Sequence, residues 1–382
     1  MSDPNIISRT THDNAPDRCE TETIGGVQCH YALKGNLNEG HPEQQDRAAA
    51  YALPGVGPDQ FQQIMTDTFA NMQAMHRGMK SANPDFAGDG CATIAMMDPQ
   101  TGRLAIGSKG DAAAYMVLQH KSDPQKVIIE RISSPYEKLA EVPEAHGGAR
   151  VQVNFRTGPN TVGRSGPVMW AHTPSDYDKY ASTGMFMSDG GKAPAFELLD
   201  LRDVVSDVLR LHHEKTAPPT SRLVKFITRS VRKQDRPEDY TVSIIVASDG
   251  ITGGIESGEQ AKKDRLQTIA SAIAGSSPNK AQALLDAVSM PKSYDNLSAV
   301  IFHDITLGRG ESVAAAIVDG NHNGNMKRVH DGSVAAQGMM ECFERAMRET
   351  QRQAASEQAA GTEHRERITQ TFVSGSFGRR TI

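Results

Sequence analysis

The chain has 382 residues, a net charge of −5 at neutral pH and a sequence pI near 6.2. This mild acidity gives no general reason to expect nucleic acid or an anionic membrane as a partner. The length allows one large domain or two ordinary ones. No apolar run reaches the roughly 18 residues that a membrane-spanning helix needs. We therefore expect neither a nucleic-acid partner nor a membrane partner.

The first residues, Met1 to Asn5, are polar and lack a basic segment followed by an apolar one, so no cleavable signal peptide is predicted. The sequence also contains no Cys-x-x-Cys pair, which argues against a zinc knuckle or a disulfide framework. Free thiols and a cytoplasmic location are expected, and export without an N-terminal signal is left open. The four cysteines are Cys19, Cys29, Cys91 and Cys342.

The N-terminal part predicts an arm, two strands and a helix. Residues 1–23 are polar and rich in Thr, Asp and Asn, and we expect them to form a loose arm. Gly25–Leu33 and Arg47–Leu53 are predicted to be strands. A helix begins near Pro58, and its Phe and Met residues recur mostly at spacings of three and four, which is typical of a face packed on a sheet.

The next part of the chain predicts antiparallel strands. Cys91–Met97 and Leu104–Ser108 flank a turn and should form a hairpin. Further strands are predicted over Ala113–Gln119 and Lys126–Ile132. From Pro135 to Ser188 the periodic pattern weakens.

The last part mixes helices with two apolar strands. The expected elements are helices at 198–211, 222–231, 258–274 and 278–288 and strands at 241–247 and 297–303. After Asp304 the chain turns polar, and a helix is predicted over 332–359. Its apolar face, Ala335, Met339, Met340, Phe343 and Met347, should dock on its own domain. Because hairpins alternate with pairs of helices, the pattern indicates an α+β fold of antiparallel sheets covered by helices.

Four aspartates lie at predicted strand ends: Asp46, Asp111, Asp249 and Asp295. Carboxylates that converge from separate strands form the oxygen-only sites that Mg²⁺ and Mn²⁺ prefer. A water held by such an ion can become a nucleophile. Each aspartate alone can equally be a turn residue or a helix cap.

The order of these motifs resembles the metal-dependent serine/threonine phosphatases of type 2C, over about residues 24–305. Ser248-Asp249-Gly250 after an apolar run is similar to the family's Ser-Asp-Gly-Leu, and Asp295-Asn296 is similar to its closing Asp-Asn segment. Three further stretches match in the same order: Gly88 to Thr93, Gly107 to Ala114, and Ile132 to Val151.

The resemblance implies a four-layer α-β-β-α sandwich of two antiparallel sheets flanked by helices. It implies a phosphatase-like domain at 24–305 with a flap at about 150–240. Residues 306–382 are then a polar linker, the helix at 332–359 and a basic tail. It also assigns roles: catalysis to Asp46, Asp249 and Asp295, substrate phosphate to His41, and metal contacts to Asp46, Gly55, Asp111, Asp249 and Asp295.

The chain departs from the family at three positions. The family's Glu-Asp-Arg is Gln45-Asp46-Arg47 here, and its phosphate-binding arginine is matched by His41. The family's Asp-Gly-His-Gly-Gly, whose Asp bridges two metal ions, aligns best with Pro54-Gly55-Val56-Gly57. Proline offers no ligand, and two divalent ions repel strongly without a shared anion. At most one Mg²⁺ or Mn²⁺ ion is therefore expected.

Two functions follow from this pattern. The first is an impaired phosphatase-like protein that binds a protein partner and acts as a regulatory module, with the 150–240 region and the helix at 332–359 as contact surfaces. The alternative is an active Mg²⁺- or Mn²⁺-dependent phosphoprotein phosphatase, or a related phosphoester hydrolase. It would use Asp46, Asp111, Asp249 and Asp295.

Overall fold

The computed structural model describes residues 6–8, 18–35, 44–110, 112–133, 151–154, 168–171, 194–213, 225–227, 235–252, 259–288, 296–321 and 329–375. The strands are β1 (Ile6–Ser8), β2 (Arg18–Ile24), β3 (Val27–Lys34), β4 (Arg47–Leu53), β5 (Asp89–Asp98), β6 (Arg103–Lys109), β7 (Ala113–His120), β8 (Asp123–Arg131), β9 (Val151–Asn154), β10 (Val168–Ala171), β11 (Ala195–Asp200), β12 (Lys225–Ile227), β13 (Tyr240–Ala247), β14 (Leu297–Ile305) and β15 (Ser312–Asn321). The helices are α1 (Phe61–Ala82), α3 (Leu201–His213), the 3₁₀ turn η2 (Pro237–Asp239), α4 (Asp249–Thr252), α5 (Glu259–Ala274), α6 (Lys280–Val288) and α7 (Val329–Gly375).

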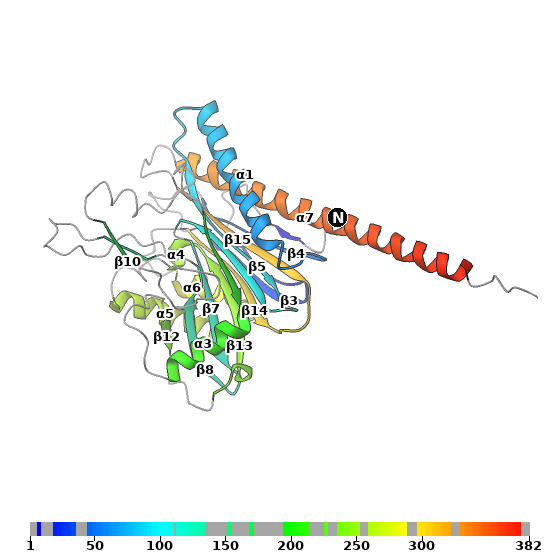
Figure 1. Cartoon of the computed structure of the whole chain (residues 1–382). Helices are drawn as coiled ribbons and strands as arrows, with labels where there is room; N and C mark the ends of the chain where they lie inside the picture. Colours follow the sequence, from blue (N-terminus) through cyan, green and yellow to red (C-terminus); the bar gives the residue numbers. More distant parts are fainter. Residues whose placement is uncertain are drawn as a thin grey trace, which may run out of the picture.

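Two antiparallel sheets form the centre of the protein. The first sheet has six strands in the order β1-β4-β15-β5-β6-β11, and the second has seven in the order β12-β8-β7-β13-β14-β3-β2. Helices α1 and α7 pack on the outer face of the first sheet, and α5 and α6 pack on that of the second (Figure 1). The predicted α+β sandwich of two antiparallel sheets between helical layers is therefore confirmed.

Side-chain alternation along each strand divides the apolar residues between the two faces of a sheet. In β4, Ala48, Ala50 and Ala52 belong to the core between the sheets, whereas Ala49, Tyr51 and Leu53 belong to the core beneath α1 and α7. Alanines on the inner face allow the two sheets to approach closely. In each strand, every second side chain therefore points toward the core between the sheets, and the others point toward the helices.

Helix α7 docks on its own domain, as the apolar face predicted. Ala335, Met339, Met340, Phe343 and Met347 are all buried. The Phe343 ring packs edge-on against Tyr51 of β4, with ring centroids 5.8 Å apart. The helix is longer than the expected 332–359, and its C-terminal end extends away from the sandwich (Figure 1).

Several predicted elements were wrong. The segment expected to be a loose arm contains β1 and β2, which are paired with β4 and β3. The helix expected from Leu198 begins only at Leu201, because residues 195–200 form strand β11 beside β6. The described part of the predicted helix 222–231 is strand β12. In the flap region, β9 and β10 form a separate two-stranded sheet.

The largest correction concerns residues 306–321, which were expected to be a polar linker. They include β15, a strand of ten residues that lies between β4 and β5 in the first sheet. Among the described strands β15 comes last in the sequence, and it has a neighbour on each side. The chain after residue 305 therefore contributes a strand to the first sheet and is part of the same domain.

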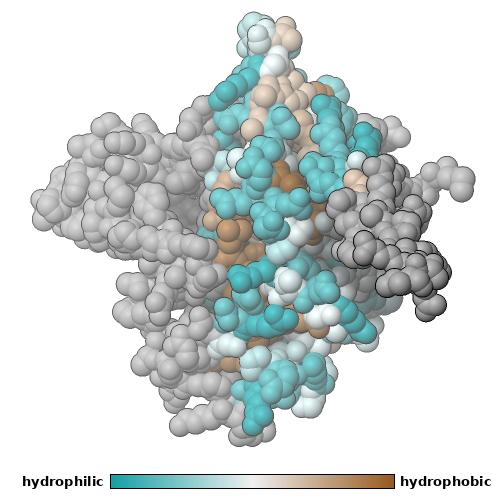
Figure 2. Space-filling view, turned by 45° about the vertical axis from the view of Figure 1, so that its right-hand side comes forward, coloured by the Kyte–Doolittle hydropathy of each residue, from teal (hydrophilic) through white to brown (hydrophobic). Residues whose placement is uncertain are grey.

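The outer surface is mainly polar on the face that Figure 2 displays, and hydrophobic residues gather in the middle of that face. Among the helices in the described part of the chain, none is both long and apolar enough to cross a bilayer.

Candidate functional site

Asp46 lies directly before β4, at the start of the strand's inner face. It is 1% exposed. Because Ala48 and Ala50 face the core between the sheets, the alternation of side chains directs Asp46 toward the same space. The expected aspartate therefore lies at the rim of the inner core.

Asp319 lies on the neighbouring strand, β15, at the register position opposite Asp46. Val318 of β15 pairs with Arg47 of β4, so one further step of the antiparallel register sets Asp319 opposite Asp46. Ala315 and Ile317 face the inner core, and Asp319 continues this alternation. It is 9% exposed. Two carboxylates thus face one space from adjacent strands.

Asp249 reaches this end of the sandwich from the second sheet. β13 ends at Ala247, and the Ser248 backbone N–H donates to the Ser298 carbonyl oxygen at 3.1 Å. The Ser298 N–H donates in return to Ser248 Oγ at 3.1 Å. These bonds fix the end of β13 beside the start of β14, directly before Asp249 begins the short helix α4.

The chain connects the two sheets at this same end. β6 ends at Lys109, and β7 begins at Ala113, which pairs with Ala247 at the end of β13. The Thr93 hydroxyl of β5 donates to the Ala112 carbonyl oxygen at 2.6 Å. Asp46, Asp319 and Asp249 therefore share one open end of the sandwich, which we call the carboxylate end.

Three of the predicted site residues, His41, Asp111 and Asp295, lie outside the described residues. The described neighbours of two of them are at the carboxylate end. Gly110 and Ala112 flank Asp111 in the β6–β7 connection. Asn296 follows Asp295 and is buried at the start of β14.

Pro54 and Gly55 are at the wrong end of the sandwich. Asp46 precedes β4 and Pro54 follows it, and seven extended residues span about 23 Å. Gly55 has a φ of +78° and lies against Gln358 and Ala354 of α7. The structure therefore does not bring Pro54 and Gly55 together with Asp46.

The carboxylate that the structure places opposite Asp46 is Asp319. The signal was present in the sequence, because Ala316-Ile317-Val318-Asp319-Gly320 is an apolar run that ends in Asp-Gly, as at Asp249-Gly250. The resemblance places such a motif directly after β4 in the sequence, whereas this Asp-Gly pair belongs to β15. β15 lies beside β4 in the first sheet, although it follows β4 by some 260 residues in the sequence.

The donor atoms at the carboxylate end suit a hard divalent cation. Like charges on directly opposite residues of neighbouring strands repel each other, and a bound cation offsets this repulsion. Ser298 faces the same inner space by alternation with Val300 and Phe302, and β14 packs against β4 and β15. Its side chain is fully buried, and its Oγ has no hydrogen-bond partner within the described residues. A ligand or its hydration shell would satisfy that hydroxyl.

Metal coordination is not complete in the described part of the chain. There, no group of three or more His, Cys, Asp or Glu side chains is arranged so that it could hold an ion. Asp46, Asp319 and Asp249 would therefore need further ligands. Asp111 and Asp295, which adjoin described residues of this end in the sequence, are candidates for these further ligands.

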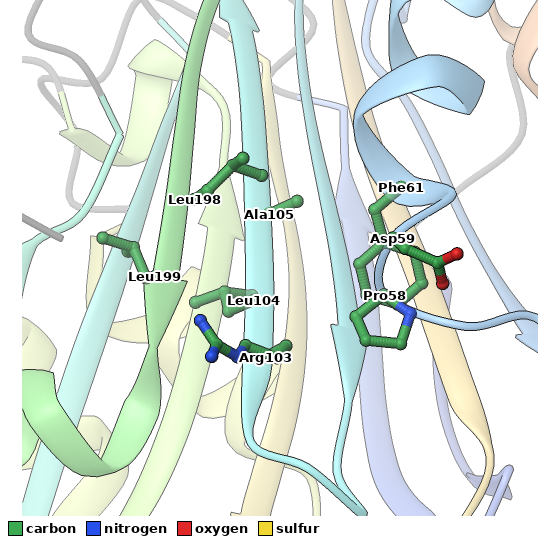
Figure 3. Close-up of a pocket in the computed structure, with 8 residues that line it drawn as sticks. All are labelled: Pro58, Asp59, Phe61, Arg103, Leu104, Ala105, Leu198 and Leu199. Atoms are coloured by element: carbon green, nitrogen blue, oxygen red, sulfur yellow. The ribbon is translucent and has the colours of Figure 1, made fainter. Parts of the chain in front are cut away.

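A pocket of about 220 Å³ lies at the opposite end of the first sheet. Figure 3 shows the start of α1 on one side and strands β6 and β11 on the other. Its lining is largely apolar, with the Asp59 carboxylate and the Arg103 guanidinium at its rim. The pocket is lined by Pro58, Asp59, Phe61, Arg103, Leu104, Ala105, Leu198 and Leu199. It is remote from the aspartates and adds nothing to their chemistry.

Comparison of the chain with protein-family models and with curated proteins gave no match.

Proposed function

We propose that this protein is a Mg²⁺- or Mn²⁺-dependent phosphoester hydrolase that resembles the type 2C serine/threonine phosphatases. The observation that carries the proposal is the register of β4 and β15, which sets Asp319 opposite Asp46 on the inner face. Asp249 lies at the same end of the second sheet. A carboxylate is thus available where two cations would share an anion.

The order of the strands supports the resemblance in space although the sequence order differs. In the family, an Asp-Gly pair ends the strand that follows the Glu-Asp-Arg motif. Here Asp319-Gly320 belongs to the strand that pairs with β4, and β15 then leads into α7. The strand and its following helix are at the C-terminus of this chain instead of directly after β4.

Five carboxylates would hold the ions: Asp46, Asp319 and Asp249, with Asp111 and Asp295. A divalent ion at such a site lowers the pKa of bound water and offsets the charge of a phosphate group. The aspartates orient the ions, and the closely packed alanines behind them exclude bulk water from the inner face. Phosphoserine or phosphothreonine proteins are the substrate class that the resemblance implies.

The regulatory-module hypothesis loses its main premise. It depended on a proline at the shared corner, and Pro54 is at the other end of β4. With Asp319 in that corner, charge no longer limits the site to one ion. We therefore favour the active hydrolase. A lack of activity would instead support a regulatory module that binds a protein partner.

The proposal predicts opposite results for two substitutions. Asp319→Asn removes a charged ligand and should lower Mn²⁺ affinity and p-nitrophenyl phosphate hydrolysis at least about 100-fold, since even outer-shell partners are worth 10- to 100-fold. Pro54→Asp should change neither, because residue 54 is about 23 Å away along β4. Isothermal titration measures Mn²⁺ binding, and assays with p-nitrophenyl phosphate and with a phosphopeptide measure hydrolysis.

Asp67→Asn is the matched control, because Asp67 is an exposed carboxylate on α1. It should behave like the wild type. If the wild-type protein binds no Mn²⁺ and cleaves neither substrate, the hydrolase proposal is wrong. If instead Pro54→Asp creates Mn²⁺ binding that Asp319→Asn leaves intact, the assignment of Asp319 is wrong.

A further inference from the structure

The first turn of α7 lies directly against the ends of three neighbouring strands. Asp331 Oδ2 accepts a hydrogen bond from the Ala87 N–H at 3.0 Å, next to the start of β5. A Cβ atom at Gly88 would overlap the Asp331 carbonyl oxygen, and one at Gly320 would lie 2.5 Å from the Gly332 carbonyl oxygen. Only glycine allows this close approach at the ends of β5 and β15.

The third contact is made by Ser333 and reaches β4 through Arg47. The Arg47 guanidinium donates through Nη2 to Ser333 Oγ at 2.9 Å and through Nε to Gln337 Oε1 at 3.2 Å. Both acceptors belong to α7, one turn apart. Arg47 is 3% exposed, whereas Ser333 and Gln337 are half-buried.

The same guanidinium holds the backbone on both sides of Gln45. Arg47 Nη1 donates to the Gln44 carbonyl oxygen at 2.7 Å and to the Asp46 carbonyl oxygen at 2.8 Å. Ser333 Oγ lies 3.3 Å from the Gln44 carbonyl oxygen and donates to it. The Asp46 N–H is bound by Gln44 Oε1 at 3.2 Å. Residues 44–46 are thus fixed by Arg47 and α7.

This arrangement matters because Asp46 precedes β4. The ladder between β4 and β15 begins at Arg47 and Val318, so it does not include Asp46. The Asp46 backbone is held at its carbonyl oxygen by Arg47 and at its N–H by Gln44 Oε1. Asp319 lies in the ladder between β15 and β5, where it pairs with Cys91. The next residue, Gly320, lies directly against the Gly332 carbonyl oxygen of α7.

We propose that Arg47, Ser333 and Gln337 form a clamp through which α7 positions the carboxylates of Asp46 and Asp319 for metal binding. This inference rests on the proposed function. Arg47 and Ser333 are positioning residues, because they hold the backbone of the ligands and are not assigned contact with the ion or the substrate. The clamp makes the metal site sensitive to the placement of the C-terminal helix.

The test compares Ser333→Ala with Ser333→Thr in the full-length chain. The alanine removes an acceptor of the buried guanidinium, and we expect Mn²⁺ affinity to fall about tenfold, as for other outer-shell partners. Threonine keeps the hydroxyl and should restore the affinity. The free Mn²⁺ signal in electron paramagnetic resonance measures binding independently of hydrolysis. Gln353→Ala, on the exposed face of α7, is the control and should bind as the wild type does.

Amide hydrogen exchange separates the clamp from the proposed function. Ser333→Ala should speed exchange at residues 45–48 and leave the middle of β5 unchanged, with or without metal. Equal exchange and equal Mn²⁺ affinity in Ser333→Ala and the wild type would overturn the clamp. If the wild type binds no Mn²⁺ but exchange at 45–48 still rises, the clamp stands as a structural device and the metal proposal fails.

Discussion

At the scale of single residues, burial controls the chemistry of His30 on the outer face of the second sheet. Burial lowers the pKa of His30 from 6.5 to about 4, and the nearby His303 and Lys280 add to this effect. The Lys280 N–H at the start of α6 donates to His30 Nδ1 at 3.0 Å. Only the neutral ring can accept that bond, so folding favours the unprotonated form.

This shift predicts how the stability depends on pH. The unfolded chain binds a proton at His30 near pH 6.5, whereas the folded chain binds it only near pH 4. The free energy of unfolding should therefore fall as pH is lowered through this window, by up to about 1.4 kcal/mol per pH unit from this group. Above pH 6.5 the contribution is complete. Urea unfolding of the wild type at pH 4.5, 5.5 and 7 measures it.

His30→Asn is the informative variant for this prediction, because Asn Oδ1 can accept from Lys280 without titrating. The fall between pH 7 and pH 4.5 should be smaller in the variant. His330→Asn removes an exposed histidine and should leave the wild-type dependence unchanged. A fall in His30→Asn as steep as in the wild type would exclude His30 as the cause.

At the scale of elements, α7 should contribute much of the stability of the first sheet. Phe343 is fully buried and packs against Tyr51. Phe343→Ala should lower the free energy of unfolding by about 3–5 kcal/mol, because the truncation leaves a cavity between α7 and β4. Gln353→Ala on the exposed face should change it by less than about 0.5 kcal/mol. Urea denaturation tests both, and a loss below about 1 kcal/mol for Phe343→Ala would contradict this packing.

The elements also show how far the sequence could predict this structure. β13 and β14 are β-branched runs, and α1 has a regular apolar stripe, so local patterns were enough to find them. β15 reads Ser-Val-Ala-Ala-Ala-Ile-Val-Asp-Gly-Asn, and its three alanines have low strand propensity. It becomes a strand because β4 and β5 pair with it on both sides. The residues of β15 show an apolar run that ends in Asp-Gly, but they do not show which distant strands it pairs with.

The same distinction between local patterns and distant pairing applies to the candidate site. Asp46 and Asp249 could be proposed because each borders a recognisable strand. Asp319 could not be linked to them, since its place opposite Asp46 depends on the register of β15. Sequence order alone favours Pro54 for the shared corner, whereas the direction of β4 places Pro54 at the opposite end from Asp46. The hydrogen bonds of Arg47 to α7 likewise join residues 286 and 290 positions apart.

At the scale of the whole molecule, the C-terminal part is a structural component of the domain. β15 lies between β4 and β5, and α7 covers their outer face. In a chain that ends at residue 305, β4 would have β1 as its remaining partner. Both faces of the first sheet would then expose apolar side chains of the two cores.

We therefore expect the fragment 1–305 to lose cooperative unfolding and to bind a dye specific for exposed apolar surface, as loosely packed states do. Deleting only 361–382 should leave the melting temperature within about 2 °C, because the described contacts of α7 with the sheet end near Gln358. Circular dichroism melting and dye fluorescence distinguish the two deletions. Cooperative unfolding of 1–305 at the wild-type temperature would mean that the sheet closes without β15, and that Asp319 is carried by a separable segment.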